Sequence, residues 1–252
     1  MLRQVTATAG VLLAPNPGPM TLEGTNSWVL RAPGHKNCVV VDPGPLDEAH
    51  LRALAAYGPV RSILLTHGHA DHSAGAALLA GLTGAPVRAL DPRHRLGGEG
   101  LGEGDVVTAA GLDLQVVATP GHTSDSLSFV LPDAVLTGDT VLGRGSAVVA
   151  HPDGVLADYL VSLRRLQELG DLAVLPGHGP ELPSAGVAAT TYLAHREQRL
   201  TQVQAALEAG ATTAREVVEA VYFDVDRALW PAATQSVLAQ LAYLEDATPG
   251  AP

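Results

Sequence analysis

Residues 63–75, ILLTHGHADHSAG, combine a strand pattern with a cluster of metal-ligating side chains. The run ILLT has the length and the β-branched residues of a buried strand. Alternate residues of an extended chain point to the same side, so His67 and His69 can share one metal ion. Asp71 and His72 lie slightly further on and can face a second ion. We therefore expect a strand that ends in a metal site.

Three further ligand-type residues follow other predicted strands. His122 lies in ATPGHTSDS, Asp139 in VLTGDTV and His178 in VLPGHGP. Each follows an apolar run, and each has a neighbouring glycine that lets the backbone turn tightly toward a shared cavity. A single histidine after a strand is usually an ordinary turn residue, but four ligands at the spacing HxHxDH seldom occur together by chance. All seven residues are therefore predicted to form one metal site.

The donor types restrict the metal ion. Histidine and carboxylate ligands suit zinc and are compatible with iron or manganese, and a thiolate site is excluded because the ligand set lacks cysteine. The single cysteine, Cys38, lies in the run CVVVD at 38–42, which predicts a buried strand. No internal disulfide can form, and we expect a reducing, cytoplasmic environment. No metal role is predicted for the other histidines, which are His35, His50, His94, His151 and His195.

Strand and helix patterns alternate along the first part of the chain. The N-terminus is interpreted as the first strands, and helices are predicted at 47–57, 72–82 and 155–169. Some strands require crossover connections, whereas 126–131 and 134–138 are joined by a short Pro-Asp turn. We therefore expect an α/β fold with mixed sheets covered by helices. The predicted strands lie near 27–30 and at 38–42, 62–66, 86–90, 112–119, 126–131, 134–139 and 172–177.

From about residue 186 the pattern is entirely helical. We expect a catalytic domain over 1–185 and a small all-helical subdomain over 186–252. Residues 201–252 contain seven acids and two arginines, a net charge of −5, so DNA binding is not expected. The predicted helices of this part are 186–208, 214–222 with Thr213 as N-cap, and 226–245.

Charge and hydropathy limit the partners of the protein. The chain has 15 basic and 26 acidic residues, and its net charge of −11 repels polyanions, so an RNA substrate would need a locally basic groove. No apolar run approaches the roughly 18 residues of a membrane span. The N-terminal segment MLRQVTATAGVLLAP also lacks the apolar core of a signal peptide. We expect no membrane partner, and the sequence does not predict an oligomeric state.

Taken together, these motifs resemble the metallo-β-lactamase fold superfamily in its two-metal hydrolase form, through HxHxDH, GHT, GDT and PGHG. The segments NPGPMTLEGTNSWVL, GDTVLGRGS, PGHGP and HREQR resemble the branch that contains the mitochondrial lactamase-beta-like endoribonuclease and fungal polyketide thioesterases. This resemblance implies an αββα sandwich followed by a winged-helix-like C-terminal domain. Only EDATPGAP follows the last predicted helix, which is too short for the usual wing hairpin.

The resemblance also implies a role for each ligand. Asp139 would bridge two metal ions, and zinc β-lactamases that share the HxHxDH loop lack an aspartate there, so antibiotic hydrolysis is not expected. Two ions about 3.5 Å apart would hold a bridging hydroxide as the nucleophile. Asp71, bound to the second ion, could orient that nucleophile through a hydrogen bond. The first ion would be bound by His67, His69 and His122, and the second by Asp71, His72 and His178.

Three functions are compatible with these ligands. Hydrolysis of a small ester or thioester, as in glyoxalase II-like and polyketide thioesterase relatives, tolerates the negative charge and is the main hypothesis. Cleavage of single-stranded RNA would need a groove built from the arginines at 93, 95, 144, 164 and 165. A persulfide-dioxygenase-like oxidoreductase would hold one iron on the first ligand set. Substrate choice is expected to depend on loops 15–27 and 143–153, the latter with Arg144 and His151.

Overall fold

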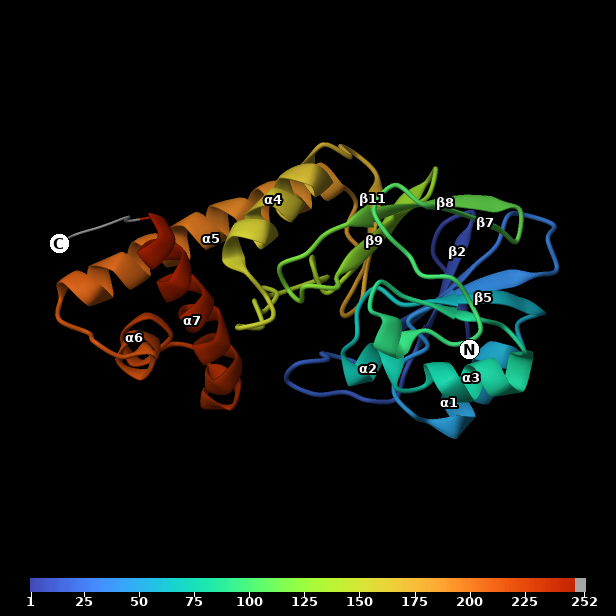
Figure 1. Ribbon diagram of the computed structural model, residues 1–252, viewed down its shortest axis with the longest axis horizontal. Coiled ribbons are helices and arrows are strands. Elements are labelled where there is room, and N and C mark those ends of the chain that lie inside the picture. The colour runs from blue at the N-terminus through green and yellow to red at the C-terminus, as the bar shows by residue number, and fades with distance from the viewer. Residues whose placement is uncertain (248–252) are drawn as a thin grey trace.

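The computed structural model describes residues 1–247, and two β-sheets form the centre of its larger part (Figure 1). The sheets have the strand orders β1-β2-β3-β4-β5-β6 and β11-β10-β9-β8-β7. The first sheet comprises β1 Arg3–Gln4, β2 Ala9–Leu13, β3 Asn26–Leu30, β4 Cys38–Val41, β5 Val60–Leu64 and β6 Val87–Arg88. The second comprises β7 Val106–Ala109, β8 Leu112–Ala118, β9 Leu127–Val130, β10 Ala134–Gly138 and β11 Ala173–Pro176.

Both sheets are mixed, as predicted. Strands β4, β5 and β6 pair in parallel, and so do β10 and β11, whereas the other pairs are antiparallel. Each parallel pair needs a crossover, and these crossovers carry the helices α1 to α4. Strand β7 is not among the predicted strands. Its hairpin to β8 turns at Ala110 and Gly111, both with positive φ, and lacks the usual Asn-Gly signal.

Side-chain alternation along the strands separates two hydrophobic layers. In β4, Val39 and Val41 belong to the core between the sheets, together with Phe129 of the second sheet. Cys38 and Val40 face the opposite way and pack in the layer under α1 Glu48–Ala55 and α3 Ala76–Thr83. The outer face of the second sheet packs against α4 Leu156–Gln167 and the start of α5 Ala185–Glu208. Helices therefore cover both outer faces, which confirms the αββα sandwich.

Helices α5, α6 Ala214–Val221 and α7 Trp230–Ala247 form a group beside the sandwich (Figure 1). Helix α5 serves both parts, because its first half packs with α4 and its second half shares a core cluster with α6 and α7. A short 3-10 helix, η2 Arg227–Leu229, precedes α7. The division at residue 185 stays a prediction.

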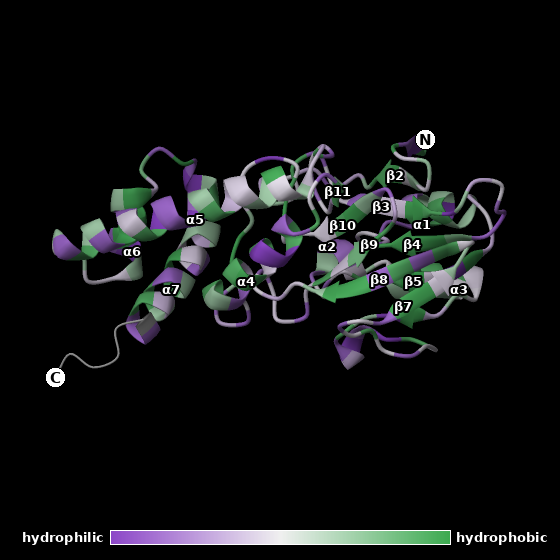
Figure 2. Cartoon of the chain, turned by 90° about the horizontal axis from the view of Figure 1, so that it is seen from above, coloured by the Kyte–Doolittle hydropathy of each residue, from purple (hydrophilic) through white to green (hydrophobic). Residues whose placement is uncertain are grey.

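Thr213 caps α6 as predicted, and Glu216 completes a capping box. Residues 213–247 are all described and contain helices without a strand. The expectation that the C-terminal segment is too short for a wing hairpin also depends on residues 248–252, which lie outside the described residues. The C-terminal helices mix polar and apolar residues (Figure 2), and among the described helices none has both the length and the hydropathy needed to cross a membrane.

Candidate metal centre

All seven predicted ligands lie at one edge of the sandwich, where four strands end. Strand β5 leads into the HxHxDH segment, and β8 leads into the loop that carries His122. Asp139 directly follows β10, and His178 lies two residues beyond β11. Because β10 and β11 are parallel neighbours, their C-terminal ends deliver Asp139 and His178 to the same place.

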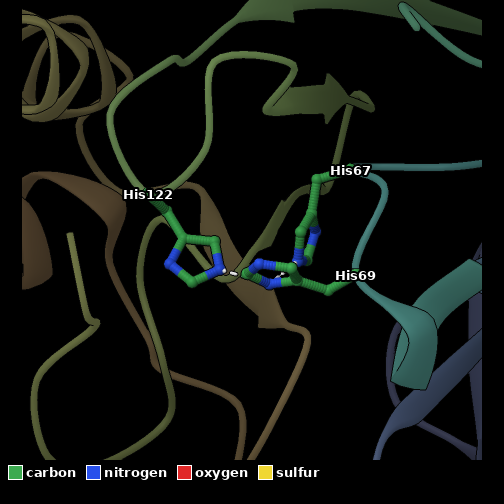
Figure 3. Close-up of side chains that lie close together, drawn as sticks. All are labelled: His67, His69 and His122. Atoms are coloured by element: carbon green, nitrogen blue, oxygen red, sulfur yellow. Dashed lines mark hydrogen bonds between the residues drawn. The ribbon is translucent and has the colours of Figure 1, made fainter. Parts of the chain in front are cut away.

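His67, His69 and His122 form the first ligand group (Figure 3). The His69 Nδ1 atom lies 3.1 Å from His67 Nε2 and 3.0 Å from His122 Nε2. All three candidate ligand atoms lie within 4.8 Å of one another. Three imidazole nitrogens that converge in this way can hold one divalent metal ion.

Asp71, His72 and His178 form the second group. His178 Nε2 lies 3.1 Å from Asp71 Oδ2 and 3.2 Å from His72 Nε2. Asp71 and His72 lie in a helical turn, α2 Ala70–Ser73, which begins two residues before the predicted helix 72–82. The turn forms because the His69 carbonyl accepts hydrogen bonds from the backbone N–H groups of residues 72 and 73. The predicted helix 72–82 is therefore two helices, α2 and α3.

Asp139 lies between the two groups. Its Oδ2 is 3.8 Å from His122 Nε2 and 3.4 Å from His178 Nε2, and its Oδ1 is 3.4 Å from His72 Nε2. The buried Oδ1 has no hydrogen-bond partner among the described residues. A buried carboxylate oxygen without a partner is unfavourable, and a bound cation would supply the missing interaction. The donor set and this orphaned oxygen both fit a pair of metal ions.

Electrostatics distinguish the two groups. Burial lowers the pKa of His67 and His122, so in both rings the neutral form that offers a lone pair is favoured. Burial also lowers the pKa of His72 and His178, but the nearby carboxylates raise it by more. Asp139 and Asp42 raise the pKa of His72 well above its usual value, and Asp139 with Asp71 raises that of His178 to about 9. A metal ion in the second group would replace protons that these carboxylates attract.

Asp42 is a site residue that sequence reasoning missed. It follows β4, is 1% exposed, and lies 2.9 Å from His72 Nδ1 through its Oδ2. It also accepts hydrogen bonds from the backbone N–H and the hydroxyl of Thr66, at 2.8 and 2.7 Å. This carboxylate orients the ring of His72, as outer-sphere partners do in metal sites. The available signal was the acid that ends the apolar run CVVVD.

Backbone carbonyl groups orient two other rings. His122 Nδ1 lies 2.7 Å from the Val148 carbonyl oxygen, and His178 Nδ1 lies 3.1 Å from that of Gly24. Each contact directs Nε2 toward the centre of the site. The loop that contains His178 is held by Trp28, whose indole N–H donates to the Pro176 carbonyl oxygen at 3.1 Å. A residue of the first sheet thereby supports His178, which follows the last strand of the second sheet.

Gly177 packs directly against the candidate ligands, and replacing it tests the site. A Cβ atom at this position would collide with Asp139 Oδ1 and lie 2.7 Å from His72 Cε1. We expect Gly177→Ala to weaken metal binding by about 10- to 100-fold, as for other changes that misorient ligands. Gly81→Ala on α3 is the matched control, because a Cβ atom there meets nothing within 4 Å. Metal titration of both variants checks this, and unchanged metal affinity in Gly177→Ala would contradict it.

A cavity of about 270 Å³ opens beside His122 and Asp139. Both loops predicted to select the substrate contribute to its wall, 15–27 through Met20 and Leu22 and 143–153 through Arg144. His151, which lies with Arg144 in the loop 143–153, is not among the described residues that line this cavity. The C-terminal helices complete the wall with side chains that include Arg196, Arg199, Tyr222 and Ser236.

The remaining histidines lie outside the seven-residue cluster. His50 is buried and pairs with the Ser27 hydroxyl at 2.9 Å, which is a packing role. His94 forms a partly exposed group with Asp91 and Asp125 whose ligand atoms also lie within 4.8 Å of one another. It packs against Gly68, where a Cβ atom would collide with the His94 ring. No other feature of the described residues indicates that this group binds a metal ion.

Comparisons with known proteins agree with this geometry. The family model of the Metallo-beta-lactamase superfamily matches residues 20–178, and that of the Beta-lactamase associated winged helix domain matches residues 213–247. The lactamase-like protein adaB of Aspergillus niger is 33% identical over 96% of this chain and 82% of its own length. The atrochrysone carboxyl ACP thioesterase of Aspergillus fumigatus is 32% identical over 84% of this chain and 72% of its own length.

Two solved structures are similar throughout their own chains. A metallo-beta-lactamase family protein from Thermus thermophilus, TTHA1429, superimposes with a TM-score of 0.80 at 25% identity, covering 95% of this chain and 94% of that one. TTHA1623 in a di-iron-bound form superimposes with a TM-score of 0.57 at 29% identity, covering 72% of this chain and 98% of that one. The first similarity includes the C-terminal helices, because it spans nearly the whole chain.

Proposed function

Because this chain belongs to the metallo-beta-lactamase superfamily and is one of its hydrolases, we propose that it cleaves a small ester or thioester with two bound metal ions. The observation that carries this proposal is Asp139, which lies between two complete three-residue ligand groups. Zinc suits the histidine and carboxylate donors, and iron or manganese is compatible with them. The two irons of TTHA1623 support the number of ions.

In this proposal each three-residue group would hold one ion, and the Asp139 carboxylate between the groups would help to hold both. Bound there, the ions would supply a nucleophilic water at neutral pH and a Lewis acid for the scissile carbonyl group. The first ion would be held by His67, His69 and His122, and the second by Asp71, His72 and His178.

The chain itself would orient the reacting groups. The Asp71 side chain is 30% exposed, so one of its oxygens can accept a hydrogen bond from the attacking water while Oδ2 stays near His178. Asp42 and the carbonyl groups of Val148 and Gly24 hold the ligand rings in place without further movement. The mostly apolar cavity beside His122 would bind the acyl chain and exclude bulk water.

Two observations support a small ester or thioester rather than RNA. The first is the similarity to a thioesterase. The second is that four of the five candidate arginines for an RNA groove already contact acids or carbonyl groups of the protein, although Arg93, Arg144 and Arg164 are exposed. Arg93 pairs with Asp91, Arg144 with Glu23 and Arg165 with Glu103, and Arg95 donates to the carbonyl groups of Ala89 and Leu90.

Metal removal and restoration test the proposed function. We expect the purified protein to contain two metal ions and to hydrolyse members of a thioester panel. Chelation should abolish turnover, because the ions supply both the nucleophile and the Lewis acid, and two equivalents of zinc should restore it. Metal analysis and thiol release measure these outcomes.

Each alternative function predicts a different result in the same experiment. One iron per chain together with oxidation of a persulfide would replace the proposal with the dioxygenase hypothesis. Cleavage of labelled single-stranded RNA without thioester turnover would favour the endoribonuclease. An Asp139→Ala sample serves as control, since RNA cleavage that survives in it comes from a contaminating nuclease.

A further inference from the structure

Arg196, on helix α5, is a buried cation without an acidic partner in the described part of the chain. Only 2% of the surface of Arg196 is exposed to solvent. The guanidinium donates to the Ala147 carbonyl oxygen and lies 4.9 Å from the centroid of the Tyr159 ring. Its Nε–H has no hydrogen-bond partner among residues 1–247, and no carboxylate there lies within ion-pair distance. Burying a guanidinium in this way is costly unless something else compensates the charge.

Arg196 lines the cavity that opens at the candidate metal centre. Tyr159, on which its guanidinium stacks, donates through its hydroxyl to the Thr140 carbonyl oxygen at 2.6 Å. Thr140 directly follows Asp139 in the chain, so Arg196 is linked to the centre through two neighbouring contacts. Because Arg196 lines the same cavity as His122 and Asp139, a substrate bound at the centre can extend toward this guanidinium.

Arg199 lies almost one helical turn further along α5 and lines the same cavity. Its guanidinium lies 4.5 Å from the centroid of the Tyr222 ring and donates to the Val221 carbonyl oxygen at 2.9 Å. Like Arg196, it forms no ion pair with any described residue. Two arginines of one helix thus present uncompensated positive charge to the cavity.

The charge of the cavity lining differs from the charge of the protein as a whole. The chain carries a net charge of −11, yet the lining contains three arginines and a single acid, Asp139, whose charge the proposed metal ions would neutralise. Arg144 is already paired with Glu23. Burial, together with Arg196 and Arg199, lowers the pKa of His195 to about 4, so that ring adds no charge at neutral pH. Most of the remaining lining is aliphatic, including Leu142, Val148, Val225, Leu229 and Ala233.

We propose that Arg196, with Arg199 beside it, binds a carboxylate of the substrate, so that the enzyme prefers esters or thioesters carrying a carboxylate next to an apolar chain. The planar guanidinium matches a carboxylate through paired hydrogen bonds, and the orphaned Nε–H is one available donor. A cavity of about 270 Å³ suits a compact organic acid. This inference rests on the proposed function.

Matched substrates test the preference and show which side of the scissile bond carries the carboxylate. Hexanoyl-N-acetylcysteamine is the neutral reference, and adipoyl-N-acetylcysteamine adds a carboxylate on the acyl side. The hexanoyl thioester of 3-mercaptopropionate carries the carboxylate on the leaving group instead. For the zinc-loaded protein we expect kcat/KM to be about 10- to 100-fold higher for one of the two charged thioesters than for the reference.

Variants of Arg196 separate recognition from structural support. Arg196→Gln should remove the preference, because it should lower kcat/KM about 10- to 100-fold more on the charged thioester than on the neutral one, and Arg196→Lys should retain part of the preference. Arg199→Gln should reduce the preference less, because Arg199 is only partly buried. Arg215→Gln, at an exposed position on α6, is the matched control and should keep the wild-type preference. An equal loss on charged and neutral thioesters would show that Arg196 only supports the fold and would overturn the proposal.

Binding to the metal-free protein tests the same residue independently of catalysis. After chelation, adipate and its neutral analogue adipamide are titrated into the wild type and into Arg196→Gln by calorimetry. We expect adipate to bind the wild type more tightly than adipamide, and the variant to bind adipate about tenfold more weakly. Equal affinity of the wild type for both compounds, or equal affinity of both proteins for adipate, would overturn the proposal. If adipate binding depends on Arg196 but no thioester is hydrolysed, the carboxylate site stands and the proposed function fails.

Discussion

Asp139→Ala is expected to lower kcat/KM on a thioester substrate by about a thousandfold or more. Asp139 is the residue whose carboxylate approaches ligands of both groups, at 3.4 Å from His72 and His178 and 3.8 Å from His122. Its removal would leave each group with three ligands and eliminate the negative charge between the two proposed ions. We therefore expect metal content to fall as well, and metal analysis with thioester kinetics checks both results.

Two further variants show what the Asp139 carboxylate contributes. Asp139→Asn keeps the shape and one oxygen but removes the charge, so it should lose most of the activity with little change in unfolding temperature. Asp91→Asn is the matched control, because Asp91 is an acid near the same edge that pairs with Arg93 and lies outside the seven-residue cluster. Full activity and two metal ions in Asp139→Ala would refute the two-metal assignment.

Asp42→Ala is expected to have the largest effect on stability, about 3 to 5 kcal/mol in the free energy of unfolding of the metal-free protein. The substitution leaves the Thr66 N–H group and the Nδ1 atom of His72 without their partner, and it leaves the Thr66 hydroxyl only its contact with His67 Nδ1 at 3.0 Å. These groups are almost wholly inaccessible to water, since Thr66 is 2% and His72 0% exposed. Urea unfolding in the presence of a chelator measures the change.

The same variant should weaken metal binding by about 10- to 100-fold, because the ring of His72 loses the carboxylate that orients it. Asp47→Ala provides the control. Asp47 caps α1 by accepting from the His50 N–H at 2.8 Å, so its loss should cost about 1 kcal/mol and leave metal affinity unchanged. If Asp42→Ala binds metal like the wild type, Asp42 has a structural role only.

The ligand motifs could be identified from the sequence because their chemistry is local. The segment from His67 to His72 places four donors within six positions, and no tertiary contact is needed to notice that density. His122, Asp139 and His178 each follow a predicted strand, and parallel strands end at the same edge of a sheet. The sandwich was predictable for a similar reason, since strand and helix periodicities are set by neighbouring residues.

Other features depend on contacts between distant segments. Asp42 meets His72 across 30 positions because β4 pairs in parallel with β5, a register that no short window of sequence reveals. The short helix α2 depends on backbone hydrogen bonds from His69, which alternate-residue reasoning did not anticipate. Arg196 belongs to the HREQR segment at 195–199, but its relation to Ala147 and Tyr159 exists only in the folded chain.

The sequence by itself determined the fold class and the seven residues that the fold brings together, because strand periodicity and ligand spacing depend only on residues close together in the chain. Only the tertiary structure decided which groups orient the ligand rings, namely Asp42 and the carbonyl groups of Val148 and Gly24. It also decided that α5 and α7 form one wall of the cavity, where Arg196 and Arg199 have no ion pair with any of residues 1–247. The proposed substrate site therefore depends on long-range packing, since its helical wall begins at residue 185 whereas the HxHxDH segment lies at 67–72.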